Sequence, residues 1–336
     1  MGAVSRALRE AALALGHPWC EDANDPDGVG VVAQPWNRDA RGRVSTNDAY
    51  LEPARSRPNL EIRGGVLVDR VQIEDGRAVG VWADGEAIAA GEVVLCAGAI
   101  QSPAILVRSG IGPAQAVRAL GMDVVCDLPG VGANLHDHPT LELPIDLEPS
   151  ARAPSAAVPV ACAFLRWREE TVADVGICPL DILDDDTSRG GLMVALLAPR
   201  SRGTLRVVST DPHTYPVARL RMLDDVRDRA RFRAAARHAA ELLRQPPLAR
   251  LGGVDLAFAE LDDDALDRWL LARTTAFAHI AGSCRLGDVV DMECRVRGVD
   301  RLRVVDGSVL PALPRATPHL TIVMIAERIA ERLTAA

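Results

Sequence analysis

The sequence predicts an α/β fold, α+β overall, and three observations support this. An apolar run at residues 93–97 ends in small residues and leads into a helix, as buried strands do in α/β folds. Short alternating segments at 59–97, separated by Asp-Gly turns, predict an antiparallel meander. Apolar residues repeat every three or four positions at 321–333, which predicts an amphipathic helix. Because the 336 residues exceed one ordinary domain, we expect two domains.

Composition and charge exclude several classes of protein. With 48% hydrophobic and 25% charged residues, the chain is expected to fold. A net charge of −8 would repel a polyanion, so no nucleic-acid partner is expected. The sequence lacks a run of about 18 apolar residues, which predicts no membrane span. The seven cysteines are an odd number without a C-x-x-C pair, which argues against a disulfide framework and against a zinc site. We therefore expect a cytoplasmic location, where cysteines stay reduced.

The N-terminal part predicts a helix followed by a loop. Residues 3–15 have apolar positions at helical spacing, and a loop is expected at 20–45. Within that loop, residues 28–33 formally match the G-x-G-x-x-A fingerprint of dinucleotide binding. Asp25-Pro26-Asp27 precedes the match where a buried strand is required, and Gln34-Pro35-Trp36 follows where a helix should run. We therefore interpret the match as accidental.

The strand at 93–97 is predicted to be buried on both faces and to end in a tight turn. Gly98-Ala99 follows the strand, and Ser102-Pro103 is predicted to open a helix that ends at Ser109-Gly110. Strand, small-residue turn and helix recur in nucleotide-binding folds, although ordinary close packing also requires small residues there.

The last helix has a predicted start and a predicted core face. Thr317-Pro318 provides a capping residue and a fixed first turn. Its apolar stripe is expected to pack in the core and consists of Ile322, Ile325, Ile329 and Leu333.

In several segments the exact residues carry more information than the pattern of apolar and polar positions does. They are RVSTNDAYLEPARSRPNLEIRGGVLVDRV at 43–71, VVLCAGAIQSPAILVRSGIG at 93–112, LPGVGANLHDHP at 128–139, RGTLRVVSTDP at 202–212, AHIAGSCRLG at 278–287, RLRVVDGSVLPALP at 301–314 and TPHLTIVMIAERIAERL at 317–333. Together they resemble the glucose-methanol-choline (GMC) flavoprotein oxidoreductases, of the choline dehydrogenase-like kind. The resemblance covers nearly the whole chain, and residues 140–195 are the least recognisable part.

This resemblance implies a domain organisation and a reaction. Residues 1–139 and 276–336 would form an FAD-binding domain, and residues 140–275 would form an antiparallel-sheet substrate-binding domain. The implied cofactor is FAD and the implied substrate is a small-molecule alcohol. The alcohol would be oxidised to a carbonyl by hydride transfer to the flavin.

The resemblance places the implied catalytic residues near the C-terminal end. His279 takes the place of the family histidine that assists removal of the hydroxyl proton, and an imidazole titrates in the right range for that role. The second family residue is normally His or Asn, but Thr317 stands there, and its hydroxyl cannot act as a base near neutral pH. We hypothesise that His319 supplies the missing imidazole. The alternative is a histidine at a helix entrance that faces elsewhere.

The resemblance also implies contacts with the cofactor. The last helix would point its positive N-terminal end at the flavin. The residues expected to contact FAD are Val68, through its backbone, Ala97, Gly98, Asp306, Gly307 and Pro318.

No metal site is expected. His136-Asp137-His138 indicates a structural turn, because adjacent side chains in an extended segment point to opposite faces. The acidic runs Asp184-Asp185-Asp186 and Asp262-Asp263-Asp264 lack the alternating oxygen ligands and the glycine of a calcium loop.

In the family pattern a βαβ unit with a G-x-G-x-x-G loop precedes the segments found here. We therefore expect the FAD-binding domain to be incomplete. Three explanations stay open: a gene fragment, a split enzyme with a separate nucleotide-binding subunit, or a non-catalytic interaction protein on the same fold. A lyase function on this fold also stays open.

Overall fold

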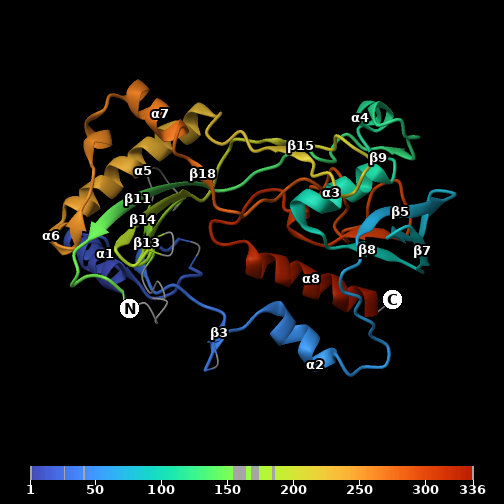
Figure 1. Cartoon of the computed structure of the whole chain (residues 1–336), viewed down its shortest axis with the longest axis horizontal. Coiled ribbons are helices and arrows are strands. Elements are labelled where there is room, and N and C mark those ends of the chain that lie inside the picture. Colours follow the sequence, from blue (N-terminus) through green and yellow to red (C-terminus); the bar gives the residue numbers. More distant parts are fainter. Residues whose placement is uncertain are drawn as a thin grey trace.

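The structure is a computed structural model that describes residues 2–25, 27–40, 42–153, 164–167, 174–183 and 186–334. Pro26, Cys162, Asp184 and Asp185, which entered the sequence analysis, lie outside these residues. Figure 1 shows two lobes, a large sheet covered by helices and a smaller α/β lobe that contains the last helix of the chain. The mixed α/β fold class predicted from the sequence is confirmed. In the described ranges, no helix is both long and apolar enough to cross a membrane.

Among the described residues, eight strands form the large, mostly antiparallel sheet. Their spatial order is β1 (Trp19–Cys20), β2 (Gly30–Val32), β12 (Phe164–Trp167), β13 (Val175–Leu180), β14 (Arg189–Leu196), β11 (Pro139–Leu147) and β17 (Gly252–Gly253), and β18 (Thr275–Ala276) also pairs with β11. The helices of this lobe are α1 (Ala3–Ala14), α5 (Val226–Arg244), α6 (Pro246–Ala249) and α7 (Asp263–Leu271).

Helix α1 is fixed to the end of β13 by one carboxylate. Asp181 accepts hydrogen bonds from Val4 N at 2.7 Å and from Ser5 Oγ at 2.7 Å, which satisfies groups at the helix start. Leu8 of this helix is fully buried in the same core as the sheet residues. Helix α1 and strands β1 and β2 therefore pack with the sheet, whereas the predicted division places residues 1–139 on the cofactor side.

In the segment at 28–33, Gly30–Val32 form a strand. In β2, Val31 pairs with Trp19 of β1 and with Leu165 of β12. The interpretation that this segment is not a phosphate loop is confirmed, because a phosphate loop must lead into a helix. Short strands thus interrupt the loop predicted at 20–45.

The smaller lobe begins with the predicted meander. Strands β5 (Val68–Glu74), β6 (Arg77–Ala83) and β7 (Glu86–Ala89) pair antiparallel in that order. The connections Asp75-Gly76 and Asp84-Gly85 have positive φ at both residues, as tight hairpin turns require. The Asp-Gly signals therefore predicted the hairpins correctly.

The predicted strand, turn and helix follow the meander. Strand β8 (Val93–Leu95) pairs in parallel with β19 (Leu302–Val304) and leads into α3 (Gly98–Arg108). Val94 is 40% exposed, so the prediction of a strand buried on both faces was wrong for the described structure.

Helix α3 begins four residues before the predicted start at Ser102 and contains Pro103. A proline inside a helix cannot donate to the carbonyl four residues earlier, here that of Ala99. Ser283 Oγ donates to Ala99 O at 2.6 Å instead. This hydrogen bond explains how the helix extends past its proline.

The last helix, α8 (His319–Thr334), is only partly covered. Ile329 is buried, and Ile322 and Ile325 pack against the core, as predicted. Leu333 is 37% exposed, so its predicted core position was wrong. Short elements complete the described part of the chain: β3 (Arg38–Asp39), β4 (Gly42–Arg43), η1 (Asn47–Leu51), α2 (Glu52–Ala54), β9 (Ile111–Gly112), α4 (Ala114–Ala119), β10 (Cys126–Asp127), β15 (Thr204–Arg206), β16 (Val217–Arg219), η2 (Ala257–Glu260) and η3 (Gly307–Val309).

Replacing Ser283 by alanine is expected to destabilise the protein. Ser283 is fully buried, and its loss leaves the Ala99 carbonyl without a donor. We expect the free energy of unfolding to fall by about 1–3 kcal/mol, measured by urea denaturation. The control is Ser56→Ala, at an exposed position. Equal stability of the two variants would contradict this account of Pro103.

Candidate active site

The carboxyl ends of β8 and β19 meet at the carboxylate of Asp306, which is 6% exposed. Its Oδ2 accepts hydrogen bonds from Gly98 N at 2.9 Å and from Ser102 Oγ at 2.5 Å, and its Oδ1 accepts from Ser308 N at 2.8 Å. Ser102 Oγ in turn accepts from Ala97 N at 3.0 Å. The structure thus brings together Ala97, Gly98 and Asp306, three of the residues predicted to contact a cofactor. Ligands of open α/β sheets bind at such strand ends.

Gly98 leaves open space at the start of α3. Its φ is +79°, a conformation that glycine adopts without strain, and an added Cβ would meet no atom within 4 Å. A ligand can therefore approach the backbone at the positive end of this helix. This observation fits a bound nucleotide or flavin.

Helix α8 and the loop before Gly282 both approach the backbone of Gly307. An added Cβ on Gly307 would lie 3.1 Å from Ile322 Cδ1 and 3.7 Å from the carbonyl oxygen of Ile280. Gly307 O also accepts a hydrogen bond from Gly282 N at 3.2 Å. Since Ile280 directly follows His279, the predicted catalytic histidine lies near the Asp306 cluster.

The His279 loop is held by Asp137, which is 2% exposed. Asp137 Oδ1 accepts from His279 N at 2.9 Å and from His138 N at 2.7 Å. Ala278 has a φ of +63°, which is strained for a residue with a Cβ. Asp137 Oδ2 is buried and has no hydrogen-bond partner among the described residues. Strain and unsatisfied polar atoms of this kind gather at functional sites.

Sequence reasoning did not predict that His138 lies beside His279 in the candidate site. Its Nδ1 lies 3.0 Å from Nδ1 of His279, and the two rings meet edge to face. Burial lowers the pKa of His138 to about 3, with a further contribution from His279, and burial lowers the pKa of His279 to about 4. Both rings are therefore neutral at pH 7. A neutral pair can share one hydrogen between the facing nitrogens.

The HDHP segment is extended and leads into β11, so the prediction of a structural turn at His136-Asp137-His138 was wrong. His136 pairs with Ala281 as an isolated bridge, and His136 Nδ1 contacts the carbonyl of Asn134 at 2.6 Å. Within the described ranges, no group of three or more His, Cys, Asp or Glu side chains could hold a metal ion.

The residues at the start of α8 have different environments. Pro318 is buried and its carbonyl accepts from Ile322 N at 3.0 Å, whereas Thr317 and His319 are exposed. His319 is the first residue of the helix. The roles of Thr317 and His319 stay predictions.

Val68 lies at the far end of α3 from Gly98. It begins β5, and the next residue, Asp69, binds Arg108 Nε at 3.1 Å near the helix C-terminus. The helix between these points has eleven residues, which corresponds to ~16 Å. The predicted contact residues thus lie along an extended path rather than in one compact pocket.

Comparison with known proteins identifies the family of this chain. Family models described as GMC oxidoreductase match residues 1–140 and residues 199–326. The chain belongs to the GMC oxidoreductase family. A GMC-type oxidoreductase of Rhodococcus erythropolis is 37% identical over 341 residues, covering 97% of this chain and 67% of the relative. An oxygen-dependent choline dehydrogenase of Burkholderia pseudomallei is 34% identical over 374 residues, covering 97% of this chain and 66% of the relative.

Solved structures of GMC enzymes share the fold. Pyridoxine 4-oxidase from Mesorbium loti superposes with a TM-score of 0.90 at 27% identity, covering 99% of this chain and 70% of that chain. Formate oxidase superposes with a TM-score of 0.90 at 21% identity, covering 100% of this chain and 70% of that chain. This GMC chain thus spans about two thirds of the length of the curated relatives it matches.

The lowered histidine pKa values predict how stability depends on pH. The folded protein holds His138 and His279 neutral, while the unfolded chain protonates them near their ordinary value of 6.5. Their contribution to the free energy of unfolding is therefore fully present above pH 6.5 and is lost as the pH falls toward about 4. We expect His279→Gln to flatten the pH dependence of the unfolding free energy between pH 6.5 and 4.5. His213→Gln, at an exposed histidine, should keep the wild-type slope. A wild-type slope in His279→Gln would contradict the assignment.

Proposed function

We propose that this chain takes part in FAD-dependent oxidation of a small-molecule alcohol to a carbonyl, with His279 as the acid/base. The observation that carries the proposal is the neutral His279, held by Asp137 and His138 beside the Asp306 cluster. The alcohol class is supported by relatives named for choline and for pyridoxine. Bound FAD would supply the hydride acceptor.

The contact with His138 bears on which ring nitrogen of His279 carries its hydrogen. A base that accepts the hydroxyl proton on Nε2 must carry its own hydrogen on Nδ1. His279 Nδ1–H would then donate to Nδ1 of His138, 3.0 Å away. In this arrangement His138 orients His279, while the strained Ala278 and the Asp137 carboxylate fix the loop.

The cofactor contacts are proposed along the path from β5 to the strand ends. Val68 would contact the adenine end, while the flavin end would lie against Ala97, Gly98, Asp306, Gly307 and Pro318. The open space at Gly98 supports this placement. The N-terminus of α8, which begins at His319, would favour negative charge on the reduced flavin. Thr317 would hold a substrate oxygen, and His319 would supply a second imidazole.

We further propose a separate nucleotide-binding subunit that completes the cofactor site. Among the described strands, β8 pairs with β19 alone, and Val94 of β8 is 40% exposed. On α8, Leu320 and Met324 are 57% and 61% exposed. Exposed large apolar side chains are typical of surfaces that bind another polypeptide. A cytoplasmic location is also proposed and is supported by six free cysteines in the described residues.

A visible absorption spectrum tests cofactor binding. We expect flavin bands near ~450 nm, as for a bound redox cofactor, when the chain is purified together with a nucleotide-binding partner. Flavin in the chain alone would contradict the need for that partner. Absence of flavin from both preparations would contradict the proposed function.

Three substitutions test the catalytic residues in a flavin-containing preparation. His279→Gln is expected to lower kcat roughly 100- to 10,000-fold, because it removes the acid/base. His319→Ala and Thr317→Ala should each lower activity if both residues contact substrate. Loss of activity with Thr317→Ala and none with His319→Ala would contradict the hypothesis that His319 replaces the second family residue.

A further inference from the structure

A hollow of about 700 Å³ lies at the N-terminal ends of β8 and β19, opposite the strand ends that carry Ala97 and Asp306. Four arginines line it: Arg77, Arg295, Arg301 and Arg303. They come from three parts of the chain, namely the start of β6, the loop before β19 and β19 itself. The proposed oxidation gives this hollow no role.

Backbone hydrogen bonds hold the arginine-bearing segments together. Ala78 N donates to Asp300 O at 2.9 Å, and Asp300 N donates to Gly76 O at 2.9 Å. Val93 N donates to Arg301 O at 2.9 Å. The positions of Arg77 and Arg301 at the wall of the hollow are thus fixed by main-chain contacts. Only their side chains need to be ordered by a ligand.

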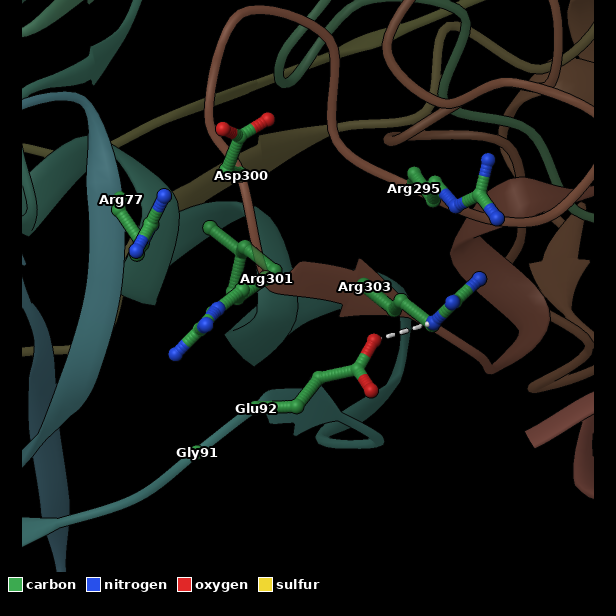
Figure 2. Close-up of a pocket in the computed structure, with 8 residues that line it drawn as sticks. Arg77, Gly91, Glu92, Arg295, Asp300, Arg301 and Arg303 are labelled. Carbon is green, nitrogen blue, oxygen red and sulfur yellow. Dashed lines mark hydrogen bonds and ion pairs between the residues drawn. The ribbon is translucent and has the colours of Figure 1, made fainter. Parts of the chain in front are cut away.

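The carboxylates at the hollow do not cancel its positive charge. Arg303 Nε pairs with Glu92 at 2.6 Å, so this carboxylate is already compensated. Figure 2 shows the Asp300 carboxylate directed away from the Arg301 guanidinium. The guanidinium groups of Arg77 and Arg301 have no hydrogen bond or ion pair with any other described residue. Arg295 lies 4.0 Å from Asp291, at the limit for an ion pair.

Arg301 also has an unfavourable backbone. Its φ is +58°, a conformation that Asn, Asp and Gly adopt more readily than arginine. The chain therefore places a long cationic side chain where a smaller residue would fold with less strain. A binding role for the guanidinium accounts for this choice.

We propose that the hollow binds a small hydrophilic anion that carries two phosphate groups. Arg77 and Arg301 would hold one phosphate and Arg295 the other, because planar guanidinium groups form paired hydrogen bonds with phosphate oxygens. Figure 2 shows Arg77 and Arg301 on one side of the hollow and Arg295 and Arg303 on the other, which suits two separated charges. The volume lies in the usual range for small-molecule sites.

Isothermal titration calorimetry with pyrophosphate as the probe tests the site on the full chain. We expect pyrophosphate to bind the wild-type chain at least tenfold more tightly than inorganic phosphate or succinate does. Arg77→Gln and Arg301→Asn should each weaken binding roughly tenfold or more, because each removes charged hydrogen bonds. The matched control is Arg219→Gln, an exposed arginine of β16, which should bind as the wild type does.

Thermal unfolding separates loss of binding from loss of folding. Arg301→Asn should keep or raise Tm, because asparagine tolerates a positive φ. The proposal is overturned if the wild-type chain does not bind millimolar pyrophosphate, or if phosphate or succinate binds as tightly. It is also overturned if Arg77→Gln and Arg301→Asn both bind with wild-type affinity.

Discussion

Three donors from two distant parts of the chain converge on the carboxylate of Asp306: Gly98 N, Ser102 Oγ and Ser308 N. A buried carboxylate is stable only when such donors surround it, and hydrogen bonds to an ionised acceptor are among the stronger ones. This contact joins the end of β8, the start of α3 and the end of β19. The open backbone at Gly98 and the approach of α8 to Gly307 both depend on it.

Asp137 is a second buried carboxylate that accepts hydrogen bonds from distant parts of the chain. Its carboxylate accepts from the backbone of His138 and of His279, and so joins the start of β11 to the loop before residue 280. The strained φ of Ala278 persists because these hydrogen bonds hold the loop. Each of the two carboxylates thus joins segments that lie far apart in the sequence. Their side chains set where the neutral imidazole of His279 lies relative to the strand ends.

The sequence predicted features that depend on local rules and missed those that depend on distant contacts. The Asp-Gly hairpins and the strand ending at small residues followed from turn and strand chemistry. The early start of α3 did not, because it needs the Ser283 hydroxyl to bind the Ala99 carbonyl. His138 was interpreted as part of a turn because its partner, His279, is 141 residues away. The resemblance pointed to His279, Asp306 and Gly98, whereas the contacts of His279 with Asp137 and His138 became visible only in three dimensions.

The sequence separations at the site also bear on how the protein is made. Asp306 contacts Gly98 across 208 residues, and Asp137 contacts His279 across 142 residues. Closing loops of this length delays the contacts that depend on them. During synthesis, the ribosome must release residue 308 before the Asp306 cluster can form. Until then the start of α3 lacks its carboxylate partner, whereas Asp137 can already support the His279 loop once residue 279 has left the ribosome. The two halves of the site are therefore completed one after the other, in the order in which their last residues are made.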